Sequence, residues 1–206
     1  MAISRTTELE AINTMLSAVG EPPITFLDGQ KNADAAIARN ILTEVSRDVQ
    51  THGWHFNTQR NVTLTPGSDT FITLSDNVVR VDIESWSDST ASTDSRDITQ
   101  RGERLFNKTD NTYAFTEEVV ATVIYLFEWI EMPEPMLRYI TVRASRIFQD
   151  RMVGSQAHHA FSQEDEVRAR AMLKEFEMDT ADHSIFGNYD VFNIIDRPSA
   201  ARRRSL

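Results

Sequence analysis

The spacing of apolar residues changes twice along this chain, and that change constrains the fold more than any single motif. Up to about Trp54 the apolar residues recur every three or four positions, which is the period of a helix. Between Asn57 and Glu131 they alternate with polar residues, which is the period of a half-buried strand. From Pro133 onward the helical period returns. The sequence therefore predicts helices, then strands, then helices again.

The clearest predicted helix lies between Met132 and Gly154. Pro133 and Pro135 stand where a first turn tolerates proline, because those backbone nitrogens have no partner within the helix. Gly154 is typical of the residue that follows a helix end. One apolar stripe follows the helical spacing: Met136, Leu137, Ile140, Ala144, Ile147, Phe148 and Met152.

Two more helices are predicted before the strands. The first opens with a capping box, in which a threonine and a glutamate three residues later satisfy each other's backbone N–H groups, and it ends at a glycine. The second ends just before another glycine, Gly53. The residues expected at their ends are Thr7 with Glu10, Gly20, Asn32 or Asp34, and about His52.

A fourth helix is expected to begin near Ser162, with Asp165 as the acid of a capping box. The pair His158–His159 is then expected in a solvated loop between the third and fourth helices. The apolar side of this helix is expected to comprise Val167, Ala169, Met172, Leu173 and Phe176.

The strand block contains several short alternating runs separated by turn residues. A polar Ser/Thr/Asp stretch at 85–97 is expected to be a loop at one end of the sheet. The longest strand is expected to lead directly into the Pro133 helix. The expected strands are 61–65, 70–74, 78–83, 97–100, 104–107, 112–115 and 119–130.

The predicted fold class is α+β: a four-helix bundle with an inserted, mainly antiparallel β unit and an extended C-terminal arm. Helices from both ends of the chain are expected to pack together, because the strand block stands between the second and third. The predicted units are 1–56 and 131–181, the two halves of the helical domain, with 57–130 as the inserted β domain and 182–206 as the arm.

The predicted arm combines apolar and basic residues without a helical period. It is too apolar for a plain solvated tail, so we expect it to lie on a partner surface. The terminal arginines could contact phosphate, although an acidic protein partner or no specific role is favoured. The candidate docking residues are Phe186, Tyr189, Phe192, Ile194, Ile195, Arg202, Arg203 and Arg204.

The net charge of −10 is unfavourable for wrapping a nucleic-acid backbone, whose phosphates need lysine and arginine. The same charge would suit the wall of a channel through which DNA slides without sticking. The absence of cysteine excludes disulfides, thiol nucleophiles and thiolate metal sites. No apolar run is long enough to cross a bilayer as a helix, so no membrane contact is expected.

Candidate catalytic and metal-binding residues are few. His52 and His55 could hold a metal, but no third ligand stands at a recognisable spacing, so capping and packing are favoured. Glu128, Glu131 and Glu134 lie at the last strand-to-helix junction, and paired carboxylates are what glycoside hydrolysis requires. Phosphate-loop, nucleophile-elbow and zinc-protease motifs are absent from the sequence. We therefore predict no catalytic residues, no cofactor and no metal.

Several blocks of the sequence, in this order, resemble the tail tubular protein A family of T7-like podophages, which are head-to-tail adaptors. The blocks cover the helical framework, whereas residues 85–115 depart from the family pattern. The residues that carry the resemblance are Glu8 to Pro23 (ELEAINTMLSAVGEPP), Asn32 to Leu42 (NADAAIARNIL), Gly53 to Asn57 (GWHFN), Met132 to Gly154 (MPEPMLRYITVRASRIFQDRMVG) and Glu164 to Asp179 (EDEVRARAMLKEFEMD).

The resemblance implies a structural adaptor of a short-tailed phage and not an enzyme. It implies a dodecameric ring that joins the portal protein to the nozzle, tail tubular protein B, and lets duplex DNA pass during ejection. The protein would then be a virion tail component assembled in the host cytoplasm. Two other readings remain open: a tail-associated glycan hydrolase using acidic residues of the β unit, and an acidic multi-helix binding module with no phage role.

Overall fold

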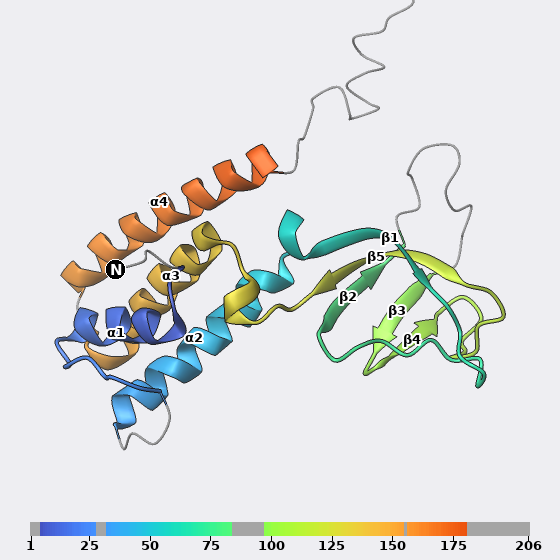
Figure 1. The fold of residues 1–206 in the computed structure, drawn as a ribbon, viewed down its shortest axis with the longest axis horizontal. Coiled ribbons are helices and arrows are strands. Elements are labelled where there is room, and N and C mark those ends of the chain that lie inside the picture. The colour runs from blue at the N-terminus through green and yellow to red at the C-terminus, as the bar shows by residue number, and fades with distance from the viewer. Residues whose placement is uncertain (1–4, 28–31, 84–96, 155, 181–206) are drawn as a thin grey trace, which may run out of the picture.

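A computed structural model describes residues 5–27, 32–83, 97–154 and 156–180, and it confirms the predicted α+β class (Figure 1). Four helices lie at one end of the molecule and the strands lie at the other (Figure 1). The helices are α1 (Glu8–Val19), α2 (Ala33–Thr51), α3 (Glu134–Met152) and α4 (Gln156–Thr180). The strands are β1 (Thr58–Leu64), β2 (Val78–Asp82), β3 (Ile98–Arg101), β4 (Arg104–Asn107) and β5 (Val119–Tyr125).

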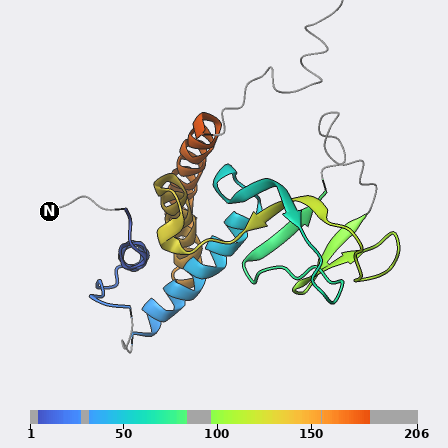
Figure 2. The same ribbon diagram turned by 45° about the vertical axis from the view of Figure 1, so that its right-hand side comes forward.

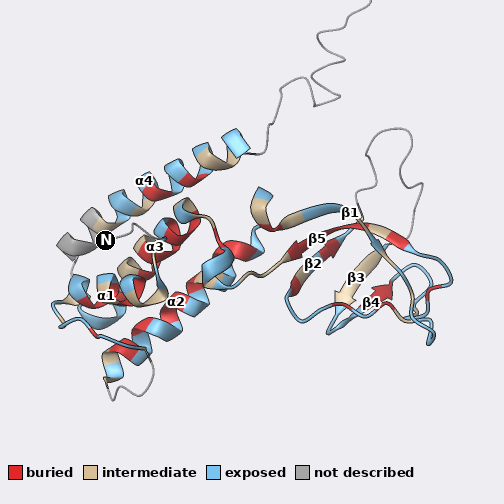
Figure 3. Ribbon diagram, in the orientation of Figure 1, coloured by how far each residue is buried: buried red, intermediate tan, exposed pale blue. Residues whose placement is uncertain are grey.

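Helix α3 is the centre of the helical part, because α1, α2 and α4 all pack against it (Figures 1 and 2). Its side chains at Met136, Ile140, Ala144 and Phe148 are completely buried, as the helical spacing predicted. The buried sides of α1 and α2 face it in Figure 3. Ile147 is only partly buried, and Met152 is 42% exposed, so the stripe narrows towards the end of the helix.

The ends of the first three helices agree with the predictions. Thr7 and Glu10 form the capping box of α1, and Gly20 follows this helix with a φ of 83°. The Asn32 side chain accepts hydrogen bonds from two backbone N–H groups at the start of α2. Gly154, with a φ of 64°, follows the end of α3. A left-handed backbone favours glycine at such a position.

Helix α4 differs from the prediction at its start and on its surface. It begins at Gln156, not near Ser162, because Gly154 turns the chain at once and no loop is needed. His158 and His159 are therefore helical residues. Only Ala169 and Leu173 are buried among the expected apolar residues, with Phe176 partly buried, whereas Val167 and Met172 are 63% and 65% exposed.

The β part has its own core. An antiparallel sheet has the strand order β1-β5-β2, and β3 and β4 form a separate antiparallel hairpin. The Gln100 side chain in β3 donates a hydrogen bond to the Val78 carbonyl in β2, which joins hairpin to sheet. The sheet and the hairpin enclose a second buried cluster: Ile72, Leu74, Val78, Val81, Leu105, Phe115, Val119, Ala121 and Val123.

Three expected strands are not present as predicted. Residues 70–74 and 112–115 make isolated bridges, such as Phe71 with Ala114, instead of strands. The expected strand 119–130 ends at Tyr125, and residues Trp129–Glu131 form a short 3₁₀ turn. Beyond Tyr125, the backbone of Leu126 binds Asn77 next to β2, and the backbone of Phe127 binds a side chain of α2, as described below.

The two buried clusters lie in the helical and strand parts, with no cluster bridging them in the described residues. The domain limits at 56/57 and 130/131 stay a prediction. The predicted arm, residues 182–206, and nearly all of the predicted loop 85–97 lie outside the described residues.

Candidate functional site: the junction groove

The chain crosses twice between the helical part and the β part, and a buried asparagine joins the two crossings. The Asn57 amide nitrogen donates to the backbone carbonyls of Gln50 (3.0 Å) and Tyr125 (2.8 Å). Its amide oxygen accepts from the Trp54 backbone N–H at 2.8 Å. Asn57 is fully buried, so its three hydrogen bonds replace those that these groups would make with water.

Gln50, near the end of α2, binds the other crossing. Its amide oxygen accepts from the Phe127 backbone N–H at 2.8 Å, and its amide nitrogen donates to the Phe127 carbonyl at 3.2 Å. This two-way contact occupies the backbone groups that would otherwise extend β5. Gly53 completes the junction: its φ of 77° is left-handed and favours glycine, and a Cβ atom there would lie 2.5 Å from Cδ1 of the Ile124 side chain, which would have to shift.

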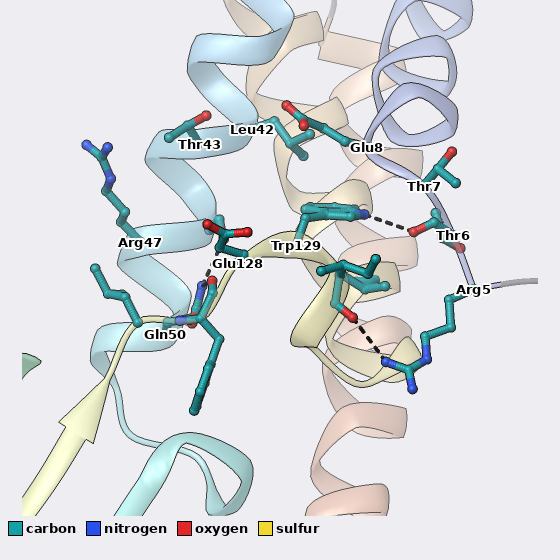
Figure 4. Close-up of a pocket in the computed structure, with 15 residues that line it drawn as sticks. Arg5, Thr6, Thr7, Glu8, Leu42, Thr43, Arg47, Gln50, Glu128 and Trp129 are labelled. Atoms are coloured by element: carbon teal, nitrogen blue, oxygen red, sulfur yellow. Dashed lines mark hydrogen bonds between the residues drawn. The ribbon is translucent and has the colours of Figure 1, made fainter. Parts of the chain in front are cut away.

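The N-terminal segment is attached to the same junction. The backbone N–H of Thr6 donates to the Glu134 carboxylate at 2.9 Å, and its hydroxyl donates to the same carboxylate at 2.5 Å. The Trp129 indole donates to the Thr6 carbonyl at 2.9 Å, and Arg5 donates to the Ile130 carbonyl at 3.1 Å (Figure 4). The segment before α1 is thereby held against the start of α3.

These elements enclose an open groove of about 940 Å³ beside the junction (Figure 4). Apolar atoms supply most of its lining surface, and the Ile130 side chain in it is 76% exposed. Aromatic and arginine residues, which are enriched at protein interfaces, are among the residues that line it. The lining residues are Arg5, Thr6, Thr7, Glu8, Leu42, Thr43, Ser46, Arg47, Gln50, Leu126, Phe127, Glu128, Trp129, Ile130 and Leu137.

Three carboxylates near the groove have hydrogen-bond partners. Glu131 accepts the Glu128 backbone N–H at 3.0 Å, and Glu134 binds Thr6. A backbone hydrogen bond from Thr7 holds the pKa of the Glu10 carboxyl below its ordinary value, and the Thr7 hydroxyl adds to the effect. Two of the three acids considered for glycoside hydrolysis are therefore explained by the hydrogen bonds at helix starts.

Each of the two histidines near the end of α2 makes a hydrogen bond within the helical part. The His52 ring nitrogen Nδ1 lies 3.0 Å from the Asp48 carbonyl, and the His55 backbone N–H donates to Glu177 in α4 at 2.6 Å. Within the described residues, no group of three histidine or acidic side chains could hold a metal ion. In the same part of the chain, no helix is long and apolar enough to cross a membrane.

A comparison with family models identifies the family to which the chain belongs. Residues 9–183 match the model of the family described as Tail tubular protein. The chain belongs to the tail tubular protein family. Its members are structural parts of the phage tail, so this protein is a structural tail component of the virion, which argues against an enzyme. A search of curated proteins finds no match to the chain.

The residues that build the junction and the residues predicted to dock are different sets. The predicted docking residues, Phe186 to Arg204, lie outside the described residues. Sequence reasoning missed Gln50 as a junction residue, although it stands eight positions after Leu42 on the buried side of α2. In the sequence Asn57 stands out only as the end of the GWHFN block and the start of the strand block. A polar residue within a buried helical stripe is the signal that could have identified Gln50.

We expect Asn57→Leu to lower the free energy of unfolding by about 2–4 kcal/mol, because it removes three hydrogen bonds at the junction and takes the side-chain partner from the Trp54 N–H and the Tyr125 carbonyl. Denaturant unfolding of the full chain measures this loss. Asn40→Leu is the matched control: Asn40 is exposed on α2, and we expect its replacement to change stability by no more than about 0.5 kcal/mol. Equal stability of the two variants would show that the junction amide contributes nothing.

Proposed function

We propose that this protein is the head-to-tail adaptor of a short-tailed phage and acts as a dodecameric ring. The ring joins the portal protein to the nozzle protein, tail tubular protein B, and duplex DNA passes through its lumen during ejection. The observation that carries this proposal is the family match over residues 9–183. The proposed assembly takes place in the host cytoplasm.

The fixed junction supports such a role. An adaptor must hold one partner at a set angle to another, and a loose connection between its two parts would not do so. Here two buried amides, Asn57 and Gln50, tie both crossings to the last turns of α2. Buried and fully paired polar groups of this kind favour one arrangement over alternatives.

The portal contact is proposed for residues 182–206. Their apolar side chains, with Phe186, Tyr189, Phe192, Ile194 and Ile195 as anchors, would enter a portal surface. The anchors include aromatic residues, which dominate the energetics of many interfaces. Arg202, Arg203 and Arg204 would meet acidic portal groups and chiefly speed the encounter.

Native mass spectrometry of the purified chain, alone and with the portal of its phage, tests the ring. We expect a mass near twelve times that of the 23.5 kDa protomer. A protein that stays monomeric under both conditions would contradict the adaptor hypothesis and favour the hypothesis of an acidic binding module. A different closed copy number would keep the ring and correct its size.

The assembled ring should bind duplex DNA only weakly at physiological salt. Each protomer contributes a net charge of −10, so the ring repels a polyanion. Fluorescence anisotropy of labelled duplex, titrated with ring at several salt concentrations, measures the affinity. Tight binding that weakens steeply with salt would contradict a non-stick conduit, because that dependence reports lysine and arginine contacts to phosphate.

A further inference from the structure

The tip of the β3–β4 hairpin carries two arginines whose side chains rest on aromatic rings. Arg101 and Arg104 face each other across the hairpin as paired residues. The Arg101 guanidinium carbon lies 3.6 Å from the centre of the Phe106 ring, and that of Arg104 lies 4.6 Å from the centre of the Phe71 ring. We call Arg101 and Arg104, with the rings beneath them, the arginine tip.

The rings hold the guanidinium groups in place before any partner arrives. Phe106 is buried and meets Tyr113 edge to face, with 4.8 Å between ring centres. A guanidinium stacked on a fixed ring has fewer conformations to lose on binding, and its planar fork matches a carboxylate. The arginine tip is therefore organised to receive oxygen anions.

The described residues offer these two arginines no carboxylate. Both are exposed, and neither forms an ion pair within the described part of the chain. Other arginines show the contrast: Arg151 binds Glu44 through two nitrogens, and Arg146 binds Glu166 at 2.5 Å. Two stacked, unpaired guanidinium groups in a chain of net charge −10 indicate a partner that brings the acid.

A second copy of this chain fits that partner better than DNA does. Each copy has 31 acidic residues against 21 basic ones, so a neighbour presents many carboxylates. Binding DNA requires several cations spread along the phosphates, and the net charge opposes it. Arginine and tyrosine are also enriched at protein interfaces.

The charge of the tip limits which surface of a neighbour it can meet. Two arginine tips repel each other because they carry like charges, so the tip must meet a different surface of its neighbour. In the proposed ring, a contact between two different surfaces is a head-to-tail contact. Repeated head-to-tail contacts form a ring when the rotation closes.

We propose that the arginine tip binds exposed carboxylates of the neighbouring subunit and is one half of the contact that closes the ring. This proposal rests on the adaptor ring proposed above, and it deepens that proposal by naming a surface. The acidic surface of the neighbour is the other half.

The test compares the assembly of the wild type with that of Arg101→Glu/Arg104→Glu at physiological salt. Native mass spectrometry and light scattering report the assembly, and thermal melting confirms the fold. We expect the double variant to need about a hundredfold higher protein concentration to form the ring, because two attractions become repulsions. Arg138→Glu/Lys174→Glu is the control: it makes the same charge change at exposed residues of α3 and α4, and we expect it to assemble normally.

The variant Arg101→Lys/Arg104→Lys tests whether the planar shape of the guanidinium groups matters in addition to their positive charge. Lysine keeps the charge but loses the planar fork, so we expect assembly between that of the wild type and that of the glutamate variant. The contact is refuted if the wild type forms a ring and the glutamate variant forms it equally well. A ring of unchanged stability that has lost residual DNA binding would assign the arginines to DNA and overturn the proposal. If the wild type stays monomeric, both the proposed ring and the proposed contact are wrong.

Discussion

Ile140→Asp is expected to abolish cooperative unfolding of the helical part. Ile140 is completely buried in α3, where α1, α2 and α4 meet, and no cation lies on this apolar stripe to pair with a new carboxylate. An unpaired charge in such a place costs several kcal/mol, which is on the order of the whole stability of a domain. Circular dichroism during heating measures the effect, and we expect a low, broad transition or none.

Ile147→Asp is the matched comparison on the same helix. The sequence pattern placed Ile147 on the same stripe, and from the pattern alone its replacement by aspartate would be expected to unfold the bundle. The structure leaves Ile147 partly exposed at the edge of the core, so the new carboxylate keeps contact with water. We therefore expect a lower melting temperature with a cooperative transition retained. Equal melting of the Ile140 and Ile147 variants would mean that the buried face of α3 is assigned wrongly.

The helix ends could be predicted because their causes are local. A capping box needs only Thr7 and Glu10, three residues apart, and a left-handed turn needs only a glycine such as Gly20. The same rule explains the error at α4. Ser162 and Asp165 form a plausible capping box in the sequence, but Gly154 had already reversed the chain, so the helix began earlier.

The end of β5 and the candidate site could not be predicted because their causes lie far apart in the sequence. Phe127 belongs to an alternating apolar run, yet its backbone binds Gln50, which is 77 residues away. Thr6 binds Glu134 across 128 residues. The exposure of Val167 and Met172 likewise depends on which helices lie beside α4, and spacing alone does not give that.

The largest functional effect is expected from truncation after Asp182. We expect the truncated protein to keep its helical and β parts folded, because both buried cores lie within residues 11–173. It should lose portal attachment, because it lacks the proposed anchors. Seven large apolar side chains lie between Ile185 and Ile195, and each could contribute roughly 1.5–3 kcal/mol when buried against a partner. Surface plasmon resonance on immobilised portal measures the loss, and circular dichroism checks the fold.

Two full-length variants separate the apolar from the basic contribution of the arm. Phe186→Ser/Phe192→Ser removes two anchors and should mainly raise the dissociation rate from the portal, because buried contacts must break before the complex separates. Replacing Arg202, Arg203 and Arg204 by serine should mainly lower the association rate, and the difference from wild type should shrink as salt screens the charges. If the truncated protein binds portals with unchanged affinity, the arm is not the docking element, and the helical part with its junction groove must make the contact instead.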